Sequence, residues 1–374
     1  VKRSTDTMSD RMTVHRDGKP IYDIVMEENY DKLGKEVAAL SVQERRLCVV
    51  TDSTVAELYS ETVIRQLEPV CKEVHLFVFE AGEKNKNLDT VRKLYEFLIQ
   101  NHYDRNDMLV ALGGGVVGDL CGFTAATYLR GIRFIQVPTT LLSQVDSSIG
   151  GKTGVDFDAY KNMVGAFHMP QLVYTAAASL LTLTEEQFAC GMGEVIKHGL
   201  IMDAGYYEWL QEHREEILAR DLSICEQMIL ISCRIKRDVV EQDPTEQGIR
   251  GILNFGHTLG HAIEKLMDFK LLHGQCVALG SIAAAYLSAG RGEITMDEAV
   301  QIRNVFEEFG LPVSIKDFGL AKEAVIAATK NDKKMDSGKI KFILLHRIGE
   351  AFIDRTVTDE QMEQSLDLLM GGAL

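Results

Sequence analysis

The sequence has no apolar run that approaches the roughly 18 residues needed for a membrane-spanning helix. Its opening segment, VKRSTDTMSDRM, also lacks the apolar stretch of a secretion signal. Basic residues are in the minority: 40 lysines and arginines against 55 aspartates and glutamates give a net charge of -15. That charge disfavours generic binding to nucleic acid or to an acidic membrane. We therefore expect a cytoplasmic protein that binds neither, although a local cluster of Lys and Arg would still hold a small anion.

Cysteine pairs with the spacing of metal or redox motifs are also missing. The sequence has no C-x-x-C, and its cysteines are scattered and odd in number. This usage is typical of reduced thiols, and we expect none of them to be a metal ligand. The seven cysteines are Cys48, Cys71, Cys121, Cys190, Cys225, Cys233 and Cys276.

Low-complexity tracts and internal repeats are absent, and 46% hydrophobic and 25% charged residues are ordinary for a globular protein. A chain of 374 residues is long for one core, so we expect two domains. Apolar strands alternating with helices predict a Rossmann-like, doubly wound parallel sheet over residues 1–176. Amphipathic helical patterns then predict a mostly α-helical domain over residues 177–374, with one late hairpin within 339–353.

The first domain begins with a predicted hairpin, residues 12–26, that turns at Asp17-Gly18, followed by a helix near residues 30–40. Ligands of such folds bind beyond the carboxyl ends of the parallel strands, so we expect the functional residues there. The further predicted strands are 46–53, 73–80, 107–115, 134–140 and 171–177, with helices at 54–67 and 88–100.

A glycine-rich turn follows the strand MLVAL: residues 113–118 read GGGVVG and fit G-x-G-x-x-G. Such glycines let a backbone approach a pyrophosphate at a helix N-terminus, but they also fit a tight turn needed only for packing. The usual acidic residue about 20 positions later is missing, and Asp52 is a better candidate for a ribose contact. A P-loop reading of SIGGKTG fails because Asp146 stands where the motif needs glycine.

Three histidines raise the question of a metal site. His257 and His261 are four residues apart and would share one face of a helix, and His273 follows a loop-like segment. Glu194, with Lys197 three residues on, lies on what we predict to be a separate helix. Two histidines and a carboxylate around Zn²⁺ form a recognisable catalytic set. Spacing does not settle which two histidines take part, and a structural histidine pair also fits.

Basic residues gather in several of the same segments. A solvated face is the simpler interpretation, but the flanking glycines and apolar residues favour an anion site. These residues are Arg130, Lys152, Lys161, Lys197, Lys236 and Arg250.

Taken together, the motifs resemble the 3-dehydroquinate synthase family, within the sugar-phosphate cyclases. The resemblance covers nearly the whole chain, and the order and spacing of the motifs are very specific. Another cyclase, a metal-dependent polyol dehydrogenase and a non-catalytic nucleotide-binding module are the alternatives. The matching motifs are LGGGVVGDLCGFTAATYLRGIRF, VPTTLLSQVDSSIGGKTGVD, KNMVGAFHMP, GEVIKHGLI, ILNFGHTLGHAIE and LLHGQ.

By this resemblance Glu194, His257 and His273 are the metal ligands, for Zn²⁺ or alternatively Co²⁺, while His261 contacts the substrate. Arg130 is expected to reach into the site of a partner subunit, which implies a homodimer. The other implied substrate residues are Asp146, Lys152, Lys161, Asn162, Lys197, Lys236, Arg250, Asn254 and one of Lys333 and Lys334. The implied NAD contacts are Asp52, Glu83, Lys86, Gly114, Gly115, Val116, Asp119, Thr139, Thr140, Asp146, Lys152, Lys161 and Thr182.

The resemblance implies conversion of 3-deoxy-D-arabino-heptulosonate 7-phosphate to 3-dehydroquinate and phosphate. The steps are transient oxidation by NAD, phosphate elimination, re-reduction, ring opening and aldol closure. The sequence departs from the family pattern at three positions. Tyr160 and Gly193 stand where glycine and alanine are usual, and Asp156 replaces a frequent asparagine.

Overall fold

The structure, a computed structural model, describes residues 10–158, 160–268, 270–330 and 340–372. The chain divides into two compact units, Val1–Thr182 (unit 1) and Leu183–Leu374 (unit 2). Unit 1 therefore ends six residues after residue 176, the boundary expected from the sequence.

Unit 1 is built on a seven-stranded sheet of order β1-β2-β9-β6-β5-β3-β4. β1 and β2 pair antiparallel at one edge, and all other neighbours are parallel. The predicted parallel sheet and the hairpin at Asp17-Gly18 are thus confirmed. The strands are β1 (Arg11–Arg16), β2 (Lys19–Glu27), β3 (Arg46–Asp52), β4 (Glu73–Phe79), β5 (Met108–Gly113), β6 (Arg133–Pro138) and β9 (Leu172–Ala176).

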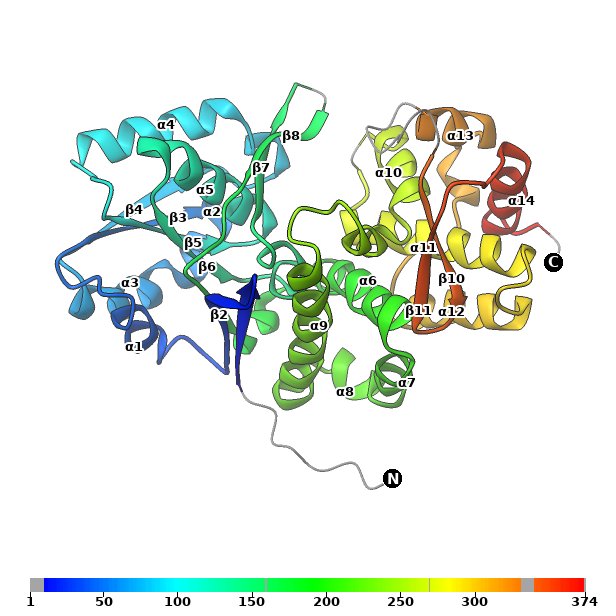
Figure 1. The fold of residues 1–374 in the computed structure, drawn as a ribbon, viewed down its shortest axis with the longest axis horizontal. Helices are drawn as coiled ribbons and strands as arrows, with labels where there is room; N and C mark the ends of the chain where they lie inside the picture. Colours follow the sequence, from blue (N-terminus) through cyan, green and yellow to red (C-terminus); the bar gives the residue numbers. More distant parts are fainter. Residues whose placement is uncertain (1–9, 159, 269, 331–339, 373–374) are drawn as a thin grey trace. The chain divides into compact units, whose positions relative to one another are not determined.

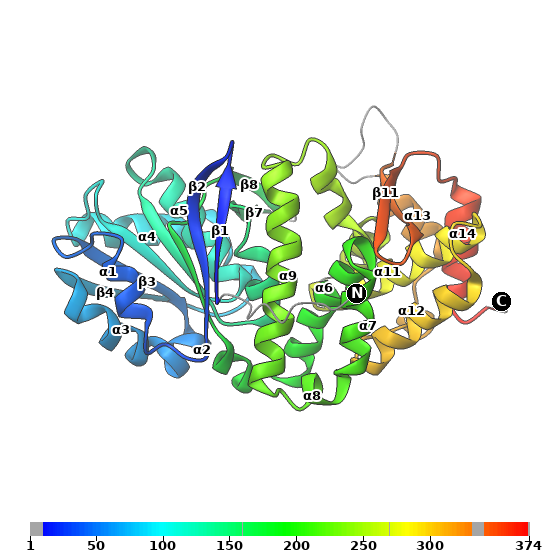
Figure 2. The same ribbon diagram turned by 60° about the horizontal axis from the view of Figure 1, so that its bottom comes forward.

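Helices cover both faces of this sheet, as Figures 1 and 2 show. Alternate strand residues feed two cores: Val49 and Val110 point to one side, Val50 and Ala111 to the other. Burial on both faces explains why the strands are continuous apolar runs. The first core is completed by α1 (Leu33–Ala38) and α3 (Glu61–Leu67), and the second by α4 (Leu88–Gln100) and α5 (Gly115–Thr127).

The predicted helix over 54–67 is present but irregular. It consists of α2 (Ser53–Val55), a π-helical segment, Ala56–Ser60, and α3. Asp52 caps α2, because its Oδ1 accepts hydrogen bonds from the amides of Thr54 and Val55 at 2.9 Å each.

The segment around Lys161, for which no strand was predicted, is part of a two-stranded antiparallel sheet. It is formed by β7 (Lys152–Phe157) and β8 (Tyr160–Phe167). Val155 and Val164 pack against the core beneath α5. Glycines and lysines interrupt the apolar alternation of these strands, which is why their pattern is weak in the sequence.

Helices dominate unit 2, as predicted. Its central helix is α11 (His273–Gly290), whose residues are almost all buried and against which α6, α10, α12 and α14 pack. The late hairpin is confirmed as β10 (Phe342–Arg347) and β11 (Glu350–Asp354). The other helices are α6 (Glu185–Met202), α7 (Ala204–Glu212), α8 (Arg214–Leu218), α9 (Leu222–Gln242), α10 (His257–Leu266), α12 (Met296–Glu308), α13 (Lys322–Lys330) and α14 (Asp359–Leu369).

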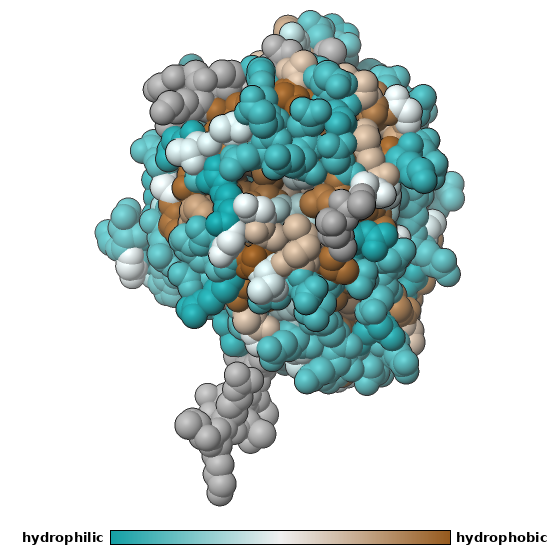
Figure 3. Space-filling view, turned by 90° about the vertical axis from the view of Figure 1, so that its right-hand side faces the viewer, coloured by the Kyte–Doolittle hydropathy of each residue, from teal (hydrophilic) through white to brown (hydrophobic). Residues whose placement is uncertain are grey.

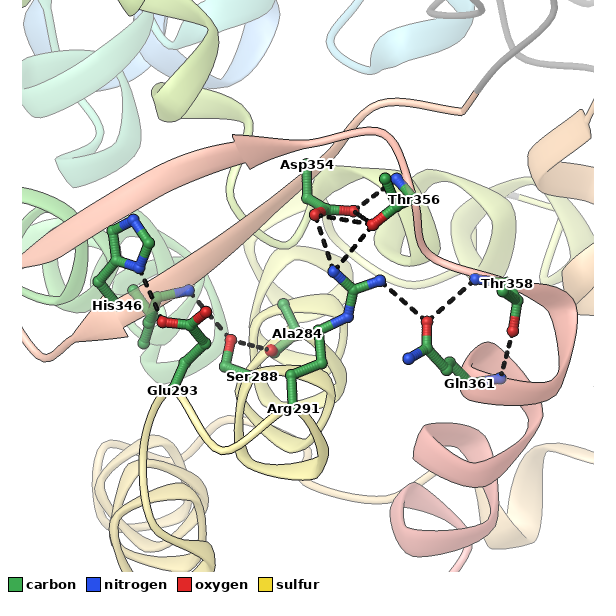
Figure 4. Close-up of polar contacts among 10 residues, drawn as sticks. Ala284, Ser288, Arg291, Glu293, His346, Asp354, Thr356, Thr358 and Gln361 are labelled. Carbon is green, nitrogen blue, oxygen red and sulfur yellow. Dashed lines mark hydrogen bonds and ion pairs between the residues drawn. The ribbon is translucent and has the colours of Figure 1, made fainter.

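A polar network ties the β10–β11 hairpin to α11 and α14 (Figure 4). Arg291, just after α11, donates to Asp354 Oδ2 at 2.7 Å and to Gln361 Oε1 at 2.9 Å. On the neighbouring strand, the amide of Leu345 donates to Ser288 Oγ at 3.0 Å. These bonds hold the hairpin against the helices of unit 2.

No helix in the described part of the chain is long and apolar enough to cross a membrane. On the face shown in Figure 3, hydrophilic side chains cover most of the surface and apolar residues appear in separate small groups. All seven cysteines are free, as expected, and all except Cys71 are buried.

Candidate active site

Several residues expected to contact a dinucleotide lie at the carboxyl edge of the sheet. Asp52 ends β3, Gly113 ends β5, and Thr139 and Thr140 directly follow β6. These three strands are neighbours in the sheet, so their ends meet at one edge. The amide of Thr139 donates to the carbonyl of Gly113 at 3.0 Å and joins two of the ends. Parallel α/β sheets bind nucleotides at this edge.

The glycine-rich turn connects β5 to α5. Gly114 is the N-cap of α5, and Gly115 and Val116 form its first turn. The first amides of a helix have no partner within the helix and carry the positive end of its dipole. The turn is tight, as packing alone would require, and it also directs a helix N-terminus to the sheet edge, as a phosphate site would require.

Lys86, a nearly buried lysine, lies among several carboxylates of unit 1. Its Nζ is 2.8 Å from Glu83 Oε1 and 3.5 Å from Asp119 Oδ2. It also donates to Asn162 Oδ1 at 2.9 Å. Burial opposes the positive charge, but Asp119, Glu83 and Asp156 outweigh it and raise the lysine pKa. The result is a fixed cation that joins the turn after β4 to α5 and to the β7–β8 hairpin.

The β7–β8 hairpin carries three of the predicted substrate residues. Lys152 begins β7, while Lys161 and Asn162 lie on β8. Asn162 has a positive φ of 51°, and its amide donates to Asp156 Oδ1 at 2.8 Å. Lys161 Nζ lies 3.9 Å from Glu83 Oε1. Asp156, one of the three departures from the family pattern, thus helps to shape the backbone that presents Asn162.

Three further predicted residues of unit 1 are less closely grouped. Asp146 lies in the π-helical turn Ser143–Ser147, and the hydroxyl of Thr182 contacts that of Tyr59. Arg130 follows the end of α5 that is opposite the glycine-rich turn. Because α5 has 13 residues, Arg130 lies about 20 Å from that turn along the helix. The structure does not bring Arg130 to the sheet edge of its own unit.

Asp119 gives a prediction for the pH dependence of stability. Burial raises the pKa of its carboxyl from 3.8 to about 6, against the attraction of Lys86. The pKa of Asp119 is therefore higher in the folded protein than in the unfolded chain. The stabilisation that this carboxyl contributes is fully present below the unfolded pKa and is lost as the pH rises through about 6. Asp119→Asn removes this titration. Its free energy of unfolding relative to wild type should rise by up to about 3 kcal/mol between roughly pH 4 and 7.

Urea unfolding of the protein without ligands, at several pH values, measures this difference. Asp89→Asn, at an exposed position of α4, is the matched control and should show no such trend. A difference between Asp119→Asn and wild type that stays constant or falls with pH would contradict the prediction.

In unit 2, Glu194, His257 and His273 come together from α6, α10 and α11. Glu194 Oε1 lies 3.8 Å from His257 Nε2 and 3.6 Å from His273 Nε2. One ligand atom from each residue falls within 4.8 Å of the others. Two ligands that are each about 2.1 Å from an ion at a tetrahedral angle lie about 3.4 Å apart. The geometry therefore fits one divalent ion.

His261 lies one turn further along α10. Its ring centroid is 5.1 Å from that of His257 and 5.9 Å from that of His273. It does not belong to the set with Glu194, but forms a second possible set with Glu264 and His273. The geometry thus favours the histidine assignment implied by the resemblance over a simple i, i+4 pair.

Close backbone contacts bring these three helices together. At Gly274 on α11, an added Cβ would lie 1.8 Å from the carbonyl oxygen of Cys190 on α6. At Gly280, it would lie 1.8 Å from the carbonyl oxygen of Gly256, which precedes α10. Gly193 faces the same contact, since its Cβ would be 2.5 Å from the carbonyl oxygen of Gly274. The spacing of the three ligands therefore depends on the absence of side chains at Gly274 and Gly280.

Lys197 offsets the charge of Glu194. Its Nζ forms an ion pair with Glu194 Oε2 and donates to the carbonyl of Leu253 at 2.7 Å. The exposed fractions of the two side chains are only 1% and 0%. A buried carboxylate is strongly destabilising without such a partner, so Lys197 both compensates the charge of Glu194 and fixes its position.

Other predicted substrate residues of unit 2 are also placed by its helices and turns. Lys236 lies on α9, and Arg250 and Asn254 lie in the 3-10 turn Ile249–Asn254. Lys236 and Arg250 are 6% and 2% exposed, which is unusual for such side chains. Lys333 and Lys334 lie outside the described residues.

Asp243 is a residue that sequence reasoning missed. Its Oδ2 accepts from the amides of Gly248 at 2.7 Å and Arg250 at 3.0 Å, and its Oδ1 accepts from that of Gln247 at 2.9 Å. Burial works against the charged form, but these bonds and the Arg250 charge lower the Asp243 pKa. An Asp-Pro pair just after a helix, with glycine four residues later, was the available turn signal.

Comparison with known proteins identifies the family. The model described as 3-dehydroquinate synthase N-terminal matches residues 76–190, and the C-terminal model matches residues 191–335. A 3-dehydroquinate synthase of Acetivibrio thermocellus is 42% identical over 342 residues, which is 91% of this chain and 94% of that protein. The chain belongs to the 3-dehydroquinate synthase family.

Two further comparisons agree with this family assignment. A 3-dehydroquinate synthase of Nitrosomonas europaea is 43% identical over 88% of this chain and 89% of that protein. A solved 2-epi-5-epi-valiolone synthase of Streptomyces hygroscopicus, with NAD⁺ and Zn²⁺ bound, is 27% identical. The two structures superpose over 94% of this chain and 97% of the valiolone synthase chain, with a TM-score of 0.86.

The family membership confirms the resemblance drawn from the motifs. The chain is an enzyme with 3-dehydroquinate synthase activity, which belongs to the shikimate pathway. Its fold is the one predicted, with a parallel-sheet unit and a helical unit as in the sugar-phosphate cyclases. The interpretations as a polyol dehydrogenase or a non-catalytic nucleotide-binding module are set aside.

Proposed function

We propose that this chain carries out the synthase reaction with NAD at the sheet edge of unit 1 and a divalent ion at Glu194, His257 and His273. The spacing of these three ligand atoms, within 4.8 Å of one another, carries the proposal. Nitrogen and carboxylate donors of this kind suit both Zn²⁺ and Co²⁺. The bound NAD⁺ and Zn²⁺ of the 2-epi-5-epi-valiolone synthase support the same pair of cofactors here.

For NAD, the proposed contacts follow the carboxyl ends of the parallel strands. The first amides of α5 would bind the pyrophosphate, and Asp52 a ribose hydroxyl. Lys86 would hold Glu83 and Asp119 in place around the cofactor. The proposed contacts are Asp52, Glu83, Lys86, Gly114, Gly115, Val116, Asp119, Thr139, Thr140, Asp146, Lys152, Lys161 and Thr182.

When bound, these groups supply reversible removal of hydride from an alcohol and polarisation of that alcohol oxygen. We assign Lys152, Asn162 and Lys197 to the substrate oxygens and phosphate. Fixed cations beside the phosphate stabilise the charge that develops on it as its carbon–oxygen bond breaks. Arg250 would bind an anionic group of the substrate. The remaining proposed substrate contacts are Asp146, Lys161, Asn254 and the partner's copy of residue 130, with one of Lys333 and Lys334.

We assign Lys236 and His261 to orientation of the substrate or to proton transfer. Both lie in unit 2 with the metal ligands, and His261 is beside His257 and His273. Holding the opened substrate in one conformer would favour its intramolecular aldol closure, because the reacting carbons no longer need to find each other.

Phosphate release from 3-deoxy-D-arabino-heptulosonate 7-phosphate tests the cofactor proposal. We expect release to need NAD⁺ only in catalytic amount, to stop with a chelator and to return with added zinc. NADH should not accumulate, since the hydride is returned to the substrate. Release that is indifferent to the chelator would contradict the metal assignment, and NADH formed in step with phosphate would contradict the transient oxidation.

We propose further that the chain acts as a homodimer. Arg130 is about 20 Å along α5 from the glycine-rich turn of its own unit, which is too far for an arginine side chain to span. One exposed apolar residue is next to Arg130 in the sequence, and others lie on the β7–β8 hairpin. Their burial against a second copy would stabilise a dimer. Light scattering should give a mass of twice 41.7 kDa, and a monomer at assay concentration would refute this. The apolar residues are Leu129, Phe157, Tyr160, Met163 and Phe167, each at least 40% exposed.

We also assign the chain to the cytoplasm. The seven free cysteines, six of them buried without a disulfide, suit a reducing compartment. Recovery of the protein outside the cytoplasm after cell fractionation would argue against this.

A further inference from the structure

We infer that Glu264 is a positioning residue that orients His273 for metal binding through the ring nitrogen that does not face Glu194. The inference rests on the proposed metal site, and it adds a carboxylate to that site. Glu264 lies on α10, and His273 is the first residue of α11. Its carboxylate therefore connects two of the three helices that supply the ligands.

The two ring nitrogens of His273 face different carboxylates. Nε2 lies 3.6 Å from Glu194 Oε1, and Nδ1 lies 3.9 Å from Glu264 Oε1. Glu194 and Glu264 thus flank one imidazole, and the nitrogen directed to the other proposed metal ligands is Nε2.

His257 shows a similar arrangement, in which a hydrogen bond to a backbone carbonyl takes the place of the longer contact with a carboxylate. Its Nε2 lies 3.8 Å from Glu194 Oε1, while its Nδ1 forms a 3.0 Å hydrogen bond with the carbonyl of Phe255. Both proposed histidine ligands therefore direct Nε2 to Glu194 and Nδ1 to an oxygen. The repetition of this pattern on separate helices supports a common role for the two oxygens.

The chemistry of imidazole explains why that oxygen matters. A neutral histidine carries one N–H, and only its other nitrogen has a lone pair for a metal. An acceptor at Nδ1 keeps the proton there, leaves Nε2 ready for the ion and fixes the plane of the ring. A carboxylate does this more strongly than a carbonyl, and it also increases the basicity of the ligand.

Burial makes Glu264 an unusual residue at this position. Its side chain is 5% exposed, although it lies three residues after His261 on a helix with other faces open to solvent. Carboxylates are rarely buried without a specific partner, because the loss of hydration is costly. The contact with His273 gives this carboxylate such a partner.

A second use of Glu264 must be separated from this one. His261, Glu264 and His273 also form a possible three-residue metal set. If that set held an ion in addition to the first, Glu264 would be a ligand and the protein would bind two ions per chain; if it held the ion in place of the first set, His261→Ala would lose its zinc. The positioning role requires one ion per chain.

Zinc affinity of the full-length protein, measured by competition with a chromophoric chelator, tests the inference without an activity readout. Glu264→Ala should weaken zinc binding by about 10- to 100-fold, and Glu264→Gln, which keeps an acceptor oxygen, by less. Glu186→Gln is the matched control. The Glu186 carboxylate accepts a hydrogen bond from Gln275 at 3.3 Å near the start of α11, the helix of His273, and it contacts no histidine among the described residues. It should keep wild-type affinity.

A spectroscopic measurement separates positioning from a general loss of structure. With ¹⁵N-labelled histidine, the zinc-loaded wild type should show His273 protonated at Nδ1, with slow exchange of that proton. Glu264→Ala should accelerate this exchange while the protein still unfolds cooperatively.

Three outcomes would overturn the inference. They are zinc affinity of Glu264→Ala within twofold of wild type, an equal loss in Glu186→Gln, and a stoichiometry of two ions per chain. A wild-type protein that binds no zinc at all would instead refute the proposed metal site, and the inference with it.

Discussion

Replacement of His257 by alanine is expected to remove bound zinc and to lower phosphate release by at least about 1000-fold. That loss corresponds to about 4 kcal/mol of transition-state stabilisation, which is within the range of a Lewis-acid metal. The reason is geometric: His257 Nε2 is one of the two nitrogens that face Glu194 Oε1. Without it, a carboxylate and a single imidazole remain, which is a weak site for a divalent ion.

His261→Ala is the matched comparison, because the two histidines are one turn apart on α10 and their rings are in contact. This variant should keep its zinc and lose about 100- to 10,000-fold in rate, as for removal of a residue that transfers a proton. Elemental analysis after gel filtration, together with the phosphate assay, measures both effects. Zinc retained in His257→Ala, or lost in His261→Ala, would show that the assignment of the two histidines is wrong.

Gly274→Ala should have the largest effect on the structure of unit 2. Its new Cβ would lie 1.8 Å from the carbonyl oxygen of Cys190, so α6 and α11 must separate. Glu194 and His273 lie on these two helices beside the contact. We expect a loss of about 3 kcal/mol or more in the free energy of unfolding, and a loss of zinc.

Gly290→Ala provides the control on the same helix. Nothing lies within 4 Å of a Cβ at this position, so the substitution should be neutral or slightly stabilising. Denaturant unfolding and zinc content of the two variants give the comparison. A Gly274→Ala protein with wild-type stability and a full complement of zinc would mean that the helix contact does not set the ligand spacing.

The sequence was sufficient for most of unit 1 because its strands are buried on both faces. Residues such as Val49, Val50 and Val110 leave a continuous apolar run that is hard to mistake. The β7–β8 hairpin was not predicted because, among its apolar residues, Val155, Val164 and Ala166 pack against the core, while Phe157, Tyr160, Met163 and Phe167 are exposed and glycines and polar residues separate them. A pattern with so few buried positions does not differ from that of a loop.

The candidate site was harder to predict from spacing alone. Helical periodicity places His257 and His261 on one face, but it does not say which of them meets a carboxylate from another helix. That choice depends on how closely α6, α10 and α11 approach, and so on residues such as Gly274, which resembles any other helix glycine in sequence. The family resemblance supplied the histidine assignment. Neither approach found Glu264, whose role depends on a contact across helices.

The position of Lys86 limits how this enzyme can be redesigned. One ammonium group contacts Glu83, Asp119 and Asn162, so the hairpin that carries the proposed substrate residues and the proposed nucleotide edge are not separable modules. If the proposed contacts hold, altering the hairpin to accept another sugar phosphate would also change the charges around the cofactor. Selection for a new substrate should therefore be carried out at limiting NAD, so that variants with weakened nucleotide affinity are eliminated at the same time.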